Sequence, residues 1–142
     1  MSLLDELYKE IILTHYKNPK NYGPLPDATL TLSGHNPSCG DQLELHLKLE
    51  DGRITNVTFS GQGCAISQAS ASMMTELIKG KPLAEALELS RKFKAMVVEG
   101  APPAPELGDL KALSGVSKLH ARVKCATLAW TTLEEAARQL EK

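Results

Sequence analysis

Strict alternation of apolar and polar residues over the segment 43–49 is the feature that most constrains how this chain can fold. Leucine occupies every second position there, at Leu43, Leu45, Leu47 and Leu49. This period of two is typical of a strand that buries one face. Asp51 and Gly52 follow as a pair typical of a hairpin turn. The pattern therefore predicts a strand that reverses and pairs with the segment after the turn.

Two neighbouring segments show the same period. Upstream, apolar and polar residues alternate over 28–33. Downstream, over 54–60, one strand face is formed by Thr55, Val57 and Phe59. Ile54 is out of phase with that face and is expected to mark the edge of the turn. The three segments together predict three antiparallel strands.

Helical spacing of apolar residues appears on both sides of the strands. The expected helices are a first one to about residue 17, one over 65–79, one from about 82, a short one over 106–113, and a last one from about 121 to the end. Gly100 and a proline-rich run separate the third from the fourth. Three methionines in these helices, Met73, Met74 and Met96, are expected to fill the core.

Length and charge restrict the class of protein. A chain of 142 residues fits one domain, residues 1–142. Its 16 basic and 17 acidic residues include no cationic block, so neither a nucleic acid nor a membrane surface is an expected partner. No apolar run approaches the roughly 20 residues of a membrane span, and the acidic N-terminal segment does not resemble a secretory signal. The expected location is the cytoplasm, where thiols stay reduced.

Three cysteines stand far apart in the chain, and two of them, Cys39 and Cys64, have glycine neighbours. Glycine lets the backbone turn sharply and leaves the sulfur accessible. An odd number of cysteines without a Cys-x-x-Cys pair excludes a full disulfide framework, a thioredoxin-type pair and a zinc ribbon. The His-x-Glu signature of zinc deaminases is also absent. Metal or sulfur chemistry is the remaining interpretation.

One set of ligands follows from the residue types. Cys64 and Cys125 each lie near an expected helix N-terminus, which favours a thiolate. Asp41 follows Cys39 by two residues, and Gly40 between them lets both side chains turn toward one point. Three thiolates and a carboxylate would complete a tetrahedral zinc site. The same thiolates could hold iron and sulfide, with the carboxylate as the most labile ligand.

Simpler interpretations stay open at this point. Each cysteine could be a small buried hydrophobic residue, above all Cys125, which has Val123 and Ala126 nearby. Asp41 could be only a turn residue before a strand. A cysteine hydrolase would need a Cys125–His120 pair and a third, orienting group.

Three motifs carry a resemblance to a known family. They are Asn36-Pro-Ser-Cys-Gly-Asp41, Phe59-Ser-Gly-Gln-Gly-Cys-Ala-Ile-Ser67 and Arg122-Val-Lys-Cys-Ala-Thr-Leu-Ala-Trp130. Together with the segment 7–19, they resemble the iron-sulfur cluster assembly proteins of the IscU, SufU and NifU N-terminal type. The resemblance implies an α+β fold in which several helices cover a three-stranded antiparallel sheet. It also implies that the ligand and sulfur-handling residues converge at one exposed end: Cys39, Asp41, Cys64 and Cys125.

Three differences from the IscU type make the SufU type the closer match. The IscU type carries a histidine directly before its third cysteine, where this chain has Lys124. It also carries a Leu-Pro-Pro-Val-Lys chaperone-recognition segment, where this chain has residues 118–122. The stretch between Cys64 and Cys125 is longer than in the IscU type, and 91–113 resembles the insertion of SufU-type members.

The resemblance implies two functional hypotheses. In the first, a cysteine desulfurase offers a persulfide, Cys39 accepts it, and zinc is held by Asp41, Cys64 and Cys125, as in a zinc-dependent sulfurtransferase. In the second, the protein is a scaffold that builds a transient [2Fe-2S] cluster on all four residues and passes it to apo iron-sulfur proteins or carriers. A weaker third interpretation is a structural zinc site whose function lies in partner contacts alone.

Overall fold

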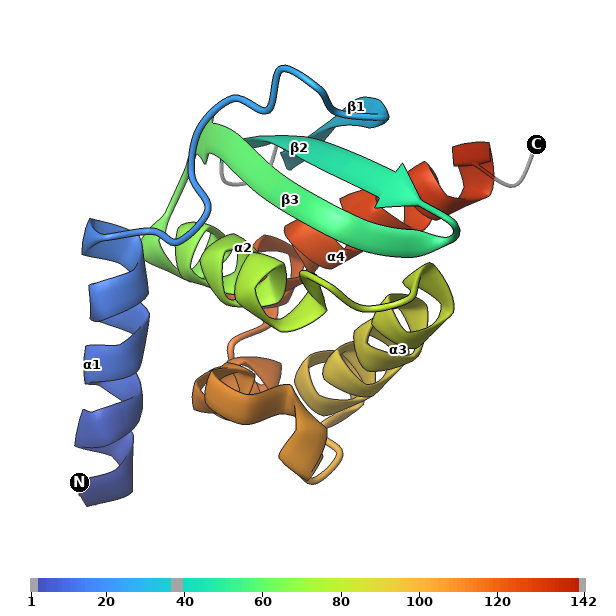
Figure 1. Cartoon of the computed structure of the whole chain (residues 1–142). Helices are drawn as coiled ribbons and strands as arrows, with labels where there is room; N and C mark the ends of the chain where they lie inside the picture. Colours follow the sequence, from blue (N-terminus) through green and yellow to red (C-terminus); the bar gives the residue numbers. More distant parts are fainter. Residues whose placement is uncertain (1–2, 37–39, 141–142) are drawn as a thin grey trace.

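The computed structural model describes residues 3–36 and 40–140, with the backbone alone for 3–8, 120 and 121 (Figure 1). The elements are, in chain order, α1 (Leu3–Lys17), β1 (Leu30–Asn36), β2 (Asp41–Glu50), β3 (Arg53–Gln62), α2 (Ala65–Ile78), α3 (Leu83–Glu99), the 3-10 helix η1 (Pro105–Lys118) and α4 (His120–Leu140). In this part of the chain, three antiparallel strands pair in the order β1-β2-β3. The α+β fold is confirmed.

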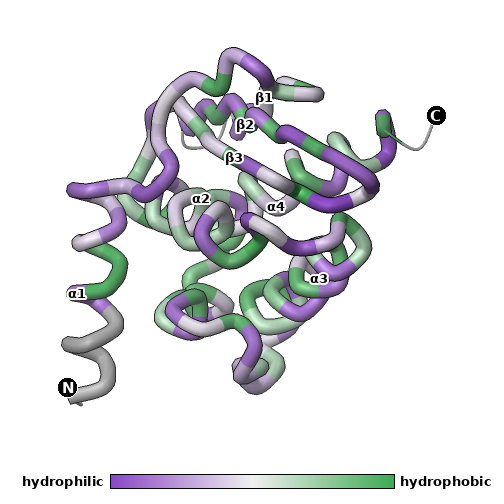
Figure 2. The backbone as a smooth tube through the Cα atoms, viewed as in Figure 1, coloured by the Kyte–Doolittle hydropathy of each residue, from purple (hydrophilic) through white to green (hydrophobic). Residues whose placement is uncertain are grey.

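The alternation of residue types correctly predicts which face of β2 is buried. Leu43, Leu45 and Leu47 are at most 4% exposed, whereas Gln42 and Glu44 are exposed. The same alternation appears as changing colours along the strands in Figure 2. Because odd-numbered residues of β2 face the helices, any polar residue at an odd position is also drawn inward.

The pairing of β2 with β3 contains a bulge. The register shifts by one residue between Lys48 and Leu49, which leaves Thr55 as an extra residue in β3. The bulge turns Ile54 onto the buried face, where it is 0% exposed, and leaves Thr55 partly exposed. The sequence-based assignment of these two residues is therefore wrong, because simple alternation assumes a ladder without an inserted residue.

The helices cover one face of the sheet. In Figure 1, α2 and α4 lie directly beneath the strands, α3 and η1 lie further below, and α1 lies beside α2 and η1. Trp130 of α4 is fully buried and stacks on Phe93 of α3, with ring centroids 5.1 Å apart. The prediction that Met73, Met74 and Met96 fill the core is confirmed, since none is more than 3% exposed.

The segment after α3 differs from the expected short helix. Instead of a helix over 106–113, a 3-10 helix covers Pro105–Lys118, with a kink at Gly108, whose φ is 56°. Every third residue in it is buried, at Leu107, Leu110, Leu113 and Val116. A 3-10 helix has three residues per turn, so this spacing of three was the available signal.

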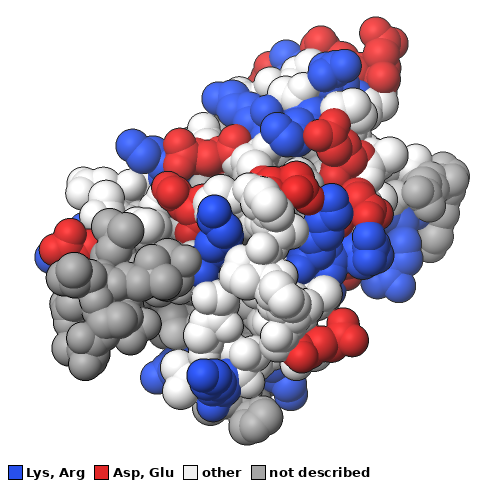
Figure 3. All heavy atoms as spheres, turned by 90° about the horizontal axis from the view of Figure 1, so that it is seen from below, with Lys and Arg blue, Asp and Glu red and all other residues white. Residues whose placement is uncertain are grey.

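The surface carries both kinds of charge, as the balanced composition of the chain predicts. On the face shown in Figure 3, basic and acidic side chains are interspersed. An exposed ion pair joins α3 to η1, with Lys92 Nζ 2.5 Å from Glu106 Oε2. Among the described residues, no helix is both long and apolar enough to cross a membrane.

Candidate metal centre

Asp41 is the residue that begins β2, and it lies on the helix-facing side of the sheet. It shares the odd-numbered face of Leu43 and Leu45, and it is 0% exposed. A carboxylate in such a place must be compensated by hydrogen bonds, a cation or both. Asn36, the last residue of β1, pairs directly with Asp41 in the sheet register. The end of the ladder therefore brings two polar side chains to the buried face.

Cys64 is placed by the turn from β3 into α2. It is the N-cap residue of α2, with extended backbone angles of φ −71° and ψ 167°. Its side chain makes no capping hydrogen bond, while its carbonyl accepts hydrogen bonds from the Gln68 N–H and the Ser67 hydroxyl, both at 3.1 Å. The thiol is half-buried. The N-terminus of α2 adds the positive end of a helix dipole beside this sulfur.

Gly63 allows Asp41 and Cys64 to come together. A Cβ atom at Gly63 would lie 2.6 Å from Ser67 Oγ and closer still to Asp41 Oδ1. No side chain fits at these separations without moving the carboxylate. The glycine beside Cys64 therefore serves close packing against Asp41.

Cys125 is positioned by the way α4 crosses β1. Gly34 has no side chain, and a Cβ there would lie 3.2 Å from Leu128 Cδ1 and closer to Thr132 Oγ1. The close approach fixes α4 over the strand, and Cys125 lies two helical turns before Thr132 on the same helix face. This places its sulfur near the end of β1, fully buried.

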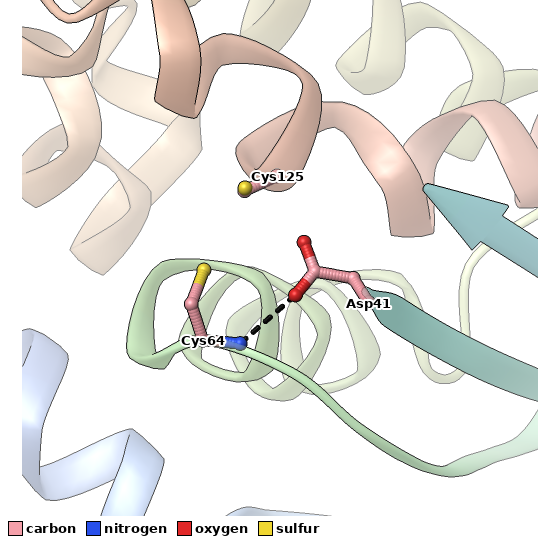
Figure 4. Close-up of side chains that lie close together, drawn as sticks. All are labelled: Asp41, Cys64 and Cys125. Atoms are coloured by element: carbon pink, nitrogen blue, oxygen red, sulfur yellow. Dashed lines mark hydrogen bonds between the residues drawn. The ribbon is translucent and has the colours of Figure 1, made fainter. Parts of the chain in front are cut away.

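The three side chains converge on one point. The ligand atoms of Asp41, Cys64 and Cys125 all lie within 4.8 Å of one another. In Figure 4 the two sulfurs and the carboxylate point toward a common space between β2, α2 and α4. The Cys64 N–H donates a hydrogen bond of 2.9 Å to Asp41 Oδ1, drawn as the dashed line. Two thiols and a carboxylate so arranged form a set of zinc-type donors.

Asn36 also belongs to this centre, although the sequence pattern alone assigns it no role. Its Nδ2 lies 3.5 Å from Asp41 Oδ2 and 3.7 Å from Cys125 Sγ, and the residue is 5% exposed. The available signal was its position at the start of the motif that ends at Asp41. Strand pairing, which the sequence left open at this end, is what brings the two residues opposite each other.

The sequence-predicted residues have different outcomes. Asp41, Cys64 and Cys125 are brought together, whereas Cys39 lies outside the described residues. Cys125 lies near the beginning of α4, as expected, but it is the sixth residue of the helix. The four unpaired N–H groups expected to favour its thiolate therefore lie before it in the helix. The side chain of His120, the proposed partner in a hydrolase, lies outside the described part.

Comparison with known proteins identifies a matching family model and similar proteins. Residues 7–142 match the family model of the NifU-like N-terminal domain. The chain is 46% identical to the zinc-dependent sulfurtransferase SufU of Bacillus subtilis, over 97% of this chain and 94% of that protein. It is 41% identical to the iron-sulfur cluster assembly scaffold protein IscU of Streptococcus pyogenes, over 98% of this chain and 87% of that protein.

A solved structure shows the same architecture. The crystal structure of the N-terminal part of a NifU-like protein from Brucella abortus is 27% identical in sequence and superposes with a TM-score of 0.87. The match covers 99% of this chain and 98% of that one. Together with the family model and the two relatives, this structure establishes that the chain belongs to the NifU-like N-terminal domain family.

Proposed function

We propose that this protein serves iron-sulfur cluster assembly by accepting sulfur from a cysteine desulfurase at the metal centre. The observation that carries the proposal is the convergence of Asp41, Cys64 and Cys125 within 4.8 Å. The identity of 46% to a protein named a zinc-dependent sulfurtransferase supports it. In this proposal the three residues hold zinc and Cys39 receives the sulfur.

The donor set fits zinc. Typical Zn–S and Zn–O bonds give a tetrahedron with edges of about 3.6–3.8 Å. The three donor atoms lie within 4.8 Å of one another, so they would close onto an ion with small side-chain adjustments. Bound zinc would supply positive charge that keeps the thiols deprotonated and, having no redox chemistry, would leave the oxidation state of sulfur unchanged.

Cys39 is tied to this centre by the chain itself. It precedes Asp41 by two residues, so its Cα lies within about 7 Å of the Asp41 Cα whatever the local conformation. Between them, Gly40 has a φ of 71°, which favours glycine. We therefore assign Cys39 as the fourth residue of the centre and as the sulfur acceptor.

The proposed transfer step is an exchange between two cysteines. The Cys39 thiolate attacks the outer sulfur of the desulfurase persulfide and forms a new S–S bond. The S–S bond in the donor breaks, and the donor cysteine leaves as a thiolate. Cys39 then carries the persulfide, and no external oxidant or reductant is consumed.

The test uses a desulfurase and cysteine labelled with radioactive sulfur. Wild-type protein is expected to carry label on Cys39, which a reducing agent releases, and Cys39→Ser is expected to carry none. Circular dichroism of both proteins controls for folding. A wild-type protein without a persulfide on Cys39, together with full desulfurase activation by Cys39→Ser, would refute the assignment.

A second candidate function is a scaffold for a transient [2Fe-2S] cluster, which would be passed to apo-proteins. The identity of 41% to a protein named an IscU scaffold favours it, as does the presence of a carboxylate among thiols, because oxygen is the weaker ligand for such a cluster. Anaerobic reconstitution should then give a transferable chromophore, and Asp41→Ala should prolong its lifetime or alter its release. Zinc-loaded protein that excludes iron and still supports cluster delivery would exclude this function.

A further inference from the structure

Asn36 contacts two of the three converging residues with a single amide group. Its Nδ2 lies 3.5 Å from Asp41 Oδ2 and 3.7 Å from Cys125 Sγ. A primary amide nitrogen carries two hydrogens, so it can donate one to each acceptor. We propose that Asn36 is a positioning residue that orients Asp41 and Cys125 for metal binding. This inference rests on the metal site proposed above.

The Asp41 carboxylate is held from both sides. Oδ1 accepts the Cys64 backbone N–H at 2.9 Å, and Oδ2 faces Asn36 Nδ2. Rotation of the carboxylate would weaken both interactions. Each carboxylate oxygen has a second lone pair, so both hydrogen bonds can persist while one oxygen binds a metal ion. The orientation of the carboxylate is thus set before the ion arrives, as in metal sites whose outer hydrogen bonds fix the ligands.

A neutral amide suits this position better than a charged side chain. The centre gathers one carboxylate and two thiols, of which the Asp41 carboxylate and the Cys125 thiol are fully buried and the Cys64 thiol is half-buried. Each buried negative charge needs compensation. A carboxylate at position 36 would add repulsion, and an ammonium group would repel the metal ion. The amide supplies N–H donors without changing the net charge of the site.

Strand geometry explains why Asn36 can serve two residues at once. It lies opposite Asp41 in the β1–β2 register. It is also two residues from Gly34, where a side chain would clash with Leu128 and Thr132 of α4. The amide therefore lies at the junction of β1, β2 and α4, where one side chain contacts both Asp41 and Cys125.

The test measures zinc affinity by competition with a chromophoric chelator. Asn36→Ala removes the amide, and Asn36→Leu fills a similar volume without N–H groups. Both are expected to weaken zinc binding about 10–100-fold and to shift the absorption bands of Co²⁺ bound in place of zinc. The control is Asn56→Ala in β3, whose side-chain oxygen accepts the Val57 N–H instead; it should change neither property.

The possible outcomes separate this inference from the proposed function. Wild-type affinity in Asn36→Leu would show that the residue only fills space and would overturn the inference. Wild-type protein that binds no zinc would overturn the proposed zinc site itself.

A measurement on wild-type protein removes any dependence on variant folding. Nuclear magnetic resonance of the Asn36 side-chain amide should show protons protected from solvent exchange and shifted by zinc. Fast exchange and unchanged resonances would contradict the proposed role.

Discussion

Two buried regions of the molecule, the apolar core beneath the sheet and the metal centre at one end of the strands, differ in what fixes their residues. In the core, Phe93 and Trp130 stack among other apolar side chains, and their volume and burial are what matter. At the centre, Asp41 is just as buried, but its carboxylate is held by hydrogen bonds, and Gly63 leaves room for it because it has no side chain. Burial alone therefore does not reveal which region a residue belongs to.

This difference predicts that core variants change stability without changing metal affinity. Site variants are expected to change metal affinity with little effect on stability. Phe93→Ala should give the largest loss of stability, about 3–5 kcal/mol, because it removes a fully buried ring and leaves a cavity. Urea unfolding followed by circular dichroism measures it. Val98→Ala is the matched control in the same helix, since Val98 is 57% exposed. A large loss of zinc affinity in folded Phe93→Ala protein would contradict the separation between core and site.

Gly63→Ala should lower zinc affinity rather than mainly change stability. The added methyl group displaces the Asp41 carboxylate, so zinc affinity should fall about 10–100-fold, the range typical of disturbed ligand orientation. Gly115→Ala is the control, because its Cβ would meet no atom within 4 Å. Competition with a chelator measures the affinity of both variants. Equal affinity in the two would show that Gly63 does not serve the site.

The hydrogen bonds that join α3 to α4 through Glu134 should have an intermediate effect on stability. Glu134 of α4 accepts hydrogen bonds from the Ser90 hydroxyl at 2.9 Å and from Lys94 Nζ at 2.5 Å, both in α3. Glu134→Ala leaves the buried Ser90 hydroxyl without this partner, which should cost about 1–3 kcal/mol of stability. Zinc affinity should not change. Glu135→Ala, which removes an ion pair with the exposed Arg138, should have little effect on unfolding.

The smallest expected effect concerns pH and the exposed pair Asp27–Lys48. The hydrogen bond from Lys48 Nζ, 2.8 Å from Asp27 Oδ2, holds the pKa of Asp27 below its usual value. The stability from this pair is therefore present above the ordinary value of about 4 and is lost as the pH falls through the lowered pKa. Asp27→Asn should lower the urea midpoint slightly near neutral pH and not in acid. An equal difference at both pH values would contradict this account.

The sequence predicts the core better than the site because periodicity reports burial. Alternation correctly predicts the buried face of β2, and it fails at Thr55, where an inserted residue breaks the period. At the site, cysteine and glycine types predict which residues converge, and Asp41, Cys64 and Cys125 do so. Asn36 was missed because its role depends on strand register and on the path of α4, which no local pattern contains.

The metal content of protein purified without added metal tests the central claim most directly. Elemental analysis with an ultraviolet-visible spectrum of the same sample should show one zinc ion per chain and no visible absorption. Iron and acid-labile sulfide in place of zinc, with visible absorption bands, would contradict the zinc-dependent sulfur-acceptor function and favour the cluster scaffold.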